Sequence, residues 1–112
     1  MKILHKICFV LLFATFSSSY AGDCFEKPYD VADCKVKAEQ NNASAQTNLA
    51  LMYVKGLGVP KDYVMAHMYW NIAAVSGNTI AIENRGLIEK DMTSSQLAEA
   101  QKLAREWMSK HQ

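Results

Sequence analysis

The chain has 112 residues, of which 50% are hydrophobic and 21% are charged, and its formal net charge is +1. This length provides for one small domain with a modest core. The near-neutral charge gives no attraction to nucleic acid or to anionic lipid, so nucleic-acid binding has no support in the composition.

The first 21 residues have the pattern of a secretory signal peptide. Lys2 and Lys6 precede an apolar run over residues 7–16, and small residues up to Ala21 form a cleavage site. The run is far shorter than the roughly 20 apolar residues that span a bilayer. We therefore expect an exported protein, periplasmic or secreted, with a mature chain of 22–112 and no membrane span. Loss of the two lysines changes the net charge from +1 to −1, with ten basic and eleven acidic side chains.

The mature chain keeps two cysteines, Cys24 and Cys34, because Cys8 leaves with the signal peptide. An even pair in an exported protein predicts a disulfide, which would stabilise the fold by roughly 2.5 to 3 kcal/mol in the chain-entropy model. Two free thiols are the alternative. A metal site is not predicted, because no third and fourth ligands lie at suitable spacing.

Two helices are predicted before residue 56. Asp30 can cap a short helix that ends at Gln40, and two asparagines then supply a stop. The segment 43–55 follows with one amphipathic stripe at helical spacing, formed by Ala45, Leu49, Met52 and Tyr53. A disulfide would tie the N-terminal tail to the first of these helices.

The next segment, residues 56–60, reads Gly-Leu-Gly-Val-Pro and predicts a sharp turn. Glycine permits left-handed dihedrals, and proline restricts the residue before it to extended conformations. Asp62 is placed to cap a following helix that carries Trp70 in its core and ends at Gly77. The two helices around the turn should approach closely, because small side chains lie where they meet.

A shift of 36 positions superposes identical residues, which predicts a second unit. The pairs are Asn42 with Asn78, Ala45 with Ala81, Asn48 with Asn84, and Leu51 with Leu87. At residues 90–94 the second unit lacks the glycine turn of the first. Thr93 and Gln96 there have the form of a capping box for a last helix, whose polar outer face suits the end of a repeat stack.

Residues 43–78 resemble a Sel-one-like repeat, a relative of the tetratricopeptide helix-turn-helix. The positions that carry the resemblance are Ala45, Leu49, Leu51, Tyr53, Gly56, Gly58, Val59, Asp62, Ala66, Trp70, Ala73, Ala74 and Gly77. The resemblance implies an all-α superhelix of antiparallel hairpins, with about five helices after the signal peptide. It divides the mature chain into a partial unit (22–42), a complete repeat (43–78) and a modified capping repeat (79–112).

The resemblance also implies a scaffold that binds another protein through its concave face. Asn48 and Asn84 recur at the repeat period on the first helix of each unit, and Met52 and Lys55 would lie beside Asn48. An amide can both donate to and accept from a peptide backbone. The alternative is that each asparagine braces a neighbouring turn. The partner's identity and a homo-oligomer stay open.

No catalytic constellation, cofactor motif or metal cluster is visible at local spacing, so an enzyme is not predicted. His67 is expected to be a packed or half-exposed residue rather than a catalytic one, and the methionines are expected to fill the core. Two other functions are kept: a small periplasmic inhibitor or immunity-type protein that binds an enzyme or toxin, and a cell-wall hydrolase. The second is the weaker, because the repeat contains no cysteines.

Overall fold

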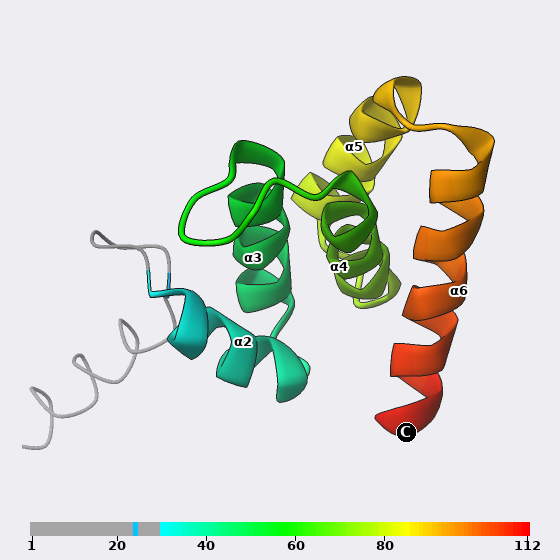
Figure 1. Ribbon diagram of the computed structural model, residues 1–112. Coiled ribbons are helices and arrows are strands. Elements are labelled where there is room, and N and C mark those ends of the chain that lie inside the picture. The colour runs from blue at the N-terminus through cyan, green and yellow to red at the C-terminus, as the bar shows by residue number, and fades with distance from the viewer. Residues whose placement is uncertain (1–23, 25–29) are drawn as a thin grey trace, which may run out of the picture.

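The computed structural model describes Cys24 and residues 30–112, and all regular structure in this part of the chain is helical (Figure 1). The α-helices are α2 (Val31–Glu39), α3 (Ala43–Lys55), α4 (Tyr63–Val75), α5 (Thr79–Ile88) and α6 (Ser94–Lys110), and the short 3-10 helix η1 (Glu89–Asp91) continues α5. The predicted all-α class with five helices is confirmed. The predicted signal peptide, residues 1–21, lies outside the described residues.

A polar side chain caps the N-terminus of every α-helix in the described residues. Each cap accepts a hydrogen bond from the backbone N–H three positions ahead, and the caps are Asp30, Asn42, Asp62, Asn78 and Thr93. The predicted capping box is present: Gln96 N donates to Thr93 Oγ1 at 3.1 Å, and Thr93 N donates to Gln96 Oε1 at 2.9 Å. Asn42 and Asn78 explain part of the 36-residue recurrence, because both begin the first helix of a unit.

The turn after α3 depends on two glycines with left-handed backbone conformations. Gly56 has φ 69° and Gly58 has φ 72°. The chain is fastened back on α3 by the amide of Leu57, which donates to Met52 O at 2.9 Å. A Cβ built on Gly58 would lie 2.7 Å from Cγ2 of Val31, so this glycine also permits close approach to α2. At the end of α4 the cap is Ser76, one residue earlier than the predicted Gly77, which follows it with φ 82°.

α4 lies at the centre of the described fold. It packs against α3, α5 and α6, while α2 packs against α3 (Figure 1). Fully buried alanines occur in all five α-helices and allow their backbones to approach; they are Ala38, Ala45, Ala50, Ala66, Ala73, Ala81, Ala100 and Ala104. Larger core side chains fill the remaining space, chiefly Leu49, Met52, Tyr53, Trp70 and Ile72. Buried aromatic rings of this kind contribute a large share of the apolar area of a small core.

Cys24 and Cys34 form a disulfide, and both side chains are buried. The bond joins Cys24 to the middle of α2, as the sequence predicted. A covalent closure across ten positions restricts the unfolded chain and so favours the folded state. α2 packs mainly against α3, and Glu39 at its end hydrogen-bonds to Trp107 and His111; the disulfide adds a covalent attachment to these contacts.

Candidate functional site: the groove between α3 and α5

A groove lies between α3 and α5, the first helices of the two consecutive units. Both helices pack against α4, but they scarcely contact each other, and a hollow of about 270 Å³ is left between them. Residues from α3, α4, α5 and η1 line this groove: Leu51, Val54, Tyr63, Trp70, Asn84, Leu87, Ile88 and Asp91. Leu51 and Leu87 occupy equivalent positions in the 36-residue repeat, so the groove is built from corresponding faces of both units.

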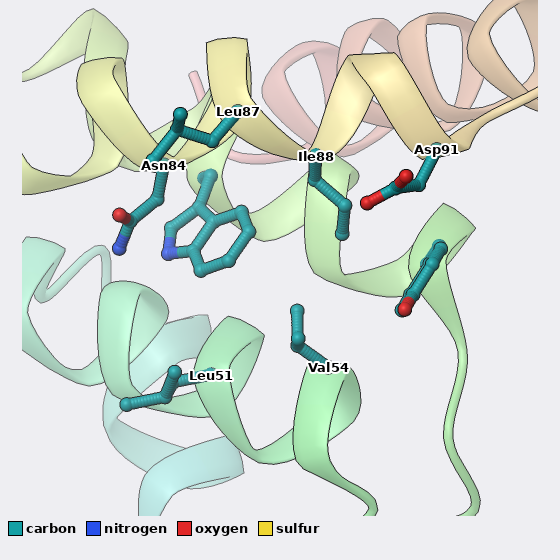
Figure 2. Close-up of a pocket in the computed structure, with 8 residues that line it drawn as sticks. Leu51, Val54, Asn84, Leu87, Ile88 and Asp91 are labelled. Carbon is teal, nitrogen blue, oxygen red and sulfur yellow. The ribbon is translucent and has the colours of Figure 1, made fainter.

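The middle of the groove is apolar. Figure 2 shows Val54 on α3 facing α5, from which Ile88 extends toward it, while Leu51 lies on α3 three positions before Val54. Ile88 and Trp70 are buried, whereas Leu87 is 60% exposed and forms part of the rim. An apolar segment that entered this groove would lose its contact with water, and that burial is the main favourable term available here.

The polar groups of the lining lie at the two ends of this apolar stretch. In Figure 2 the amide of Asn84 extends from α5 toward α3, and the carboxylate of Asp91 extends from η1 toward the groove. Asp91 is exposed and is the charged residue among those that line the groove. Neither side chain makes a hydrogen bond or ion pair within the described residues. Both are therefore able to interact with a ligand.

A hydrogen bond between the buried His67 and the partly exposed Glu89 connects η1, which forms one wall of the groove, to α4. Nε2 of His67, on α4, lies 2.9 Å from Oε1 of Glu89. A carboxylate oxygen accepts hydrogen bonds, so Nε2 is the ring nitrogen that carries the hydrogen. His67 is 1% exposed, and its Nδ1 has no partner among the described residues. Ile88 lies directly before Glu89, so this contact holds the groove lining in place.

The four residues predicted to bind a partner are not all brought together. Asn84 lines the groove, whereas Asn48 is half-buried on α3 outside the lining, and Lys55 is exposed at the end of α3. The prediction for Met52 is wrong, because its side chain is completely buried. It follows Leu49 by three positions and so shares the helix face that packs into the core.

The amides of Asn48 and Asn84 do not brace neighbouring turns. Within the described residues neither side chain makes a hydrogen bond, while the capping bonds are made by Asn42 and Asn78. The bracing alternative therefore finds no support, and both amides keep their full capacity to donate and accept.

Sequence reasoning missed most of the groove lining, notably Val54, Ile88 and Asp91. The one signal that could have found part of it was the repeat shift, which pairs Leu51 with Leu87. Nothing in the local sequence marks Asp91 as a groove residue, because its place depends on how η1 continues α5.

The described residues hold no group of three or more His, Cys, Asp or Glu side chains that could bind a metal ion. In the same part of the chain, no helix has the combined length and apolar character that crossing a membrane requires. His67 contacts a carboxylate rather than a hydroxyl or thiol, so it does not form a nucleophile and base pair within these residues.

Comparison with known proteins identifies the repeat and the fold. The family model of the Sel1 repeat matches residues 43–78. The chain is also similar to a solved structure described as a protective antigen present in uropathogenic Escherichia coli strains, displaying an SLR fold. The two share 34% sequence identity with a TM-score of 0.70, over 72% of this chain and 18% of the antigen chain, so the chain spans less than a fifth of that protein. Residues 43–78 are therefore a Sel1 repeat, and they belong to a stack of helical hairpins that is similar to an SLR fold.

Proposed function

We propose that this protein is an exported scaffold, without catalytic activity of its own, that binds a segment of another protein in the groove between α3 and α5. Sel1-like repeats form a helical fold that mediates protein interaction. The observation that carries the proposal is the groove itself, an open apolar hollow with two free polar side chains, Asn84 and Asp91, at its ends. Solenoid repeats offer such surfaces to extended ligands.

The groove favours a binding role over a reaction. Its hollow of about 270 Å³ is slightly smaller than the roughly 300 to 1,000 Å³ typical of small-molecule pockets, and it opens along the side of the molecule. Its lining contains one carboxylate and no histidine, cysteine or lysine. Acid–base or nucleophilic catalysis needs a second group within hydrogen-bond reach, and the hydroxyl of Tyr63, also in the lining, makes no hydrogen bond to Asp91 within the described residues.

Export is supported by the signal-peptide pattern of the first 21 residues and by the disulfide between Cys24 and Cys34. Disulfides persist in the periplasm and outside the cell and are rare in the cytosol. Fractionation tests this part of the proposal. We expect the protein in the exported fraction with its N-terminus at Gly22 and no free thiol, and a full-length, reduced chain in the cytosol would refute it.

Site-specific photo-crosslinking tests the groove. A photoreactive residue at Leu87, 60% exposed on the rim, is compared with one at Val75, 69% exposed and outside the groove. We expect a discrete adduct from position 87 in the native cell envelope, absent from position 75 and lost when Leu51→Glu places a charge in the groove. Equal adducts at both positions, or an adduct that survives Leu51→Glu in a folded protein, would contradict the proposal.

A further inference from the structure

We propose that the groove selects an extended peptide in which an aliphatic residue stands two positions before or after a lysine or arginine. This inference rests on the proposed function, because it names the chemical class of ligand for the same groove. Three features of the lining carry it: the apolar middle, the lone carboxylate of Asp91, and the distances along α5 and η1 that separate Asn84, Ile88 and Asp91.

The apolar middle selects an aliphatic side chain. Val54 and Ile88 face each other across the groove, and Trp70 belongs to the same lining (Figure 2). Fully burying one Leu, Ile or Val side chain contributes about 1.5 to 3 kcal/mol. The indole N–H of Trp70 is buried and has no acceptor among the described residues.

The carboxylate selects a basic side chain. Asp91 has no ion-pair partner within residues 30–112, and it is the charged member of the lining. Lys90 precedes Asp91 in the chain and is exposed, and no ion pair joins the two within the described residues. The ammonium of Lys61 lies 5.1 Å from the centroid of the Tyr63 ring, which belongs to the groove lining. Lys61 lines a neighbouring hollow with Asp62, Tyr63 and Gln96, and within the described residues it forms no ion pair with Asp91, which stays open to a ligand.

The spacing of the lining residues sets the register of the peptide. Asn84 and Ile88 are four α-helical residues apart, which is about 6 Å along the helix axis. Ile88 and Asp91 are three 3-10 residues apart, which is also about 6 Å along the axis. An extended peptide advances about 3.3 Å per residue, so each interval corresponds to about two peptide residues. Side chains two positions apart lie on the same face of an extended strand, and the aliphatic and basic groups therefore point into the groove together.

The amide of Asn84 then lies two residues beyond the aliphatic position, where it can hydrogen-bond the peptide backbone. Because an amide donates and accepts, this contact does not depend on the side chain that the peptide carries there. The groove thus reads two side chains and one backbone position.

Selection of random hexapeptides on the immobilised, oxidised protein tests the inference. We expect enrichment of peptides with Leu, Ile or Val two positions from Lys or Arg. In the Asp91→Lys variant we expect Asp or Glu to replace the basic residue. The matched control is Glu106→Lys, the same charge change at an exposed position of α6 outside the groove, which should leave the basic preference unchanged.

Binding of a selected peptide and its lysine-to-alanine variant gives the magnitude. We expect a two- to fivefold weaker affinity for the alanine variant, in the range of an exposed ion pair. Suppose that peptides are enriched, that Leu51→Glu abolishes this enrichment, and that the peptides show no preference for Lys or Arg. This result would overturn the inference and leave the proposed function standing. If Leu51→Glu leaves peptide enrichment unchanged, in a protein whose circular dichroism is also unchanged, both the inference and the proposed function are overturned.

Discussion

Replacing Gly58 by alanine should destabilise the protein more than the same change at Gly56 or Gly77. All three glycines have left-handed backbones, with φ of 72°, 69° and 82°. An alanine in that conformation costs roughly 1 to 2 kcal/mol at each position. At Gly58 alone the new Cβ would lie 2.7 Å from Cγ2 of Val31, whereas the nearest atom to a Cβ at Gly56 is 3.6 Å away and none lies within 4 Å at Gly77.

The collision adds about 1 to 3 kcal/mol, the usual cost of overpacking, so Gly58→Ala should cost about 2 to 5 kcal/mol in total. For a domain of this size each kcal/mol lowers the melting temperature by about 4 to 8 °C. Thermal unfolding followed by circular dichroism measures the three variants. In a Val31→Ala background, Gly58→Ala should cost no more than Gly56→Ala. Equal melting temperatures for the two single variants, or no relief from Val31→Ala, would refute the argument.

The remaining predictions concern the contacts that hold the helices together. Reduction of the disulfide should remove about 2.7 kcal/mol, from the chain-entropy relation for a closure of ten positions, and an unchanged urea midpoint with reductant would contradict this. Glu89→Ala leaves the buried Nε2–H of His67 without an acceptor, and it should lower the free energy of unfolding in urea by about 1 to 3 kcal/mol. Glu89→Gln keeps an acceptor oxygen and should lower it less. Equal losses in the two variants would show that this hydrogen bond is not the cause. The backbone carbonyl of Trp107, aided by the carboxylate of Glu39, raises the pKa of His111 above 6.5, so its contribution to stability is complete below pH 6.5 and is lost as the pH rises through the folded-state pKa. NMR titration should show a lower His111 pKa in Glu39→Gln, and an identical pKa would contradict the assignment.

The helices could be predicted from the sequence because their ends are marked locally. Asp30, Asp62 and Thr93 are side chains that accept from backbone amides, and Gly56 permits the left-handed residue that ends α3. Such signals act within four residues and do not depend on the rest of the fold.

The groove could not be predicted in the same way, because it depends on the angle between helices. Met52 lies three positions after Leu49 and four after Asn48, so the sequence alone assigns it equally to the core and to the concave face. Packing decides in favour of the core. Asp91 reaches the groove because α5 continues into the 3-10 helix η1, and no residue pattern at 89–91 predicts a 3-10 helix there.

α3 and α5 each pack against α4 and scarcely contact one another. The width of the groove therefore depends on the orientation of α5 relative to α4. Small rocking of α5 would open or narrow the gap without unfolding any helix, and an occupant that bridges both helices would damp this motion. Amide hydrogens of α5 should then exchange more slowly when the space is filled, while those of α6 on the opposite side of α4 should be unaffected.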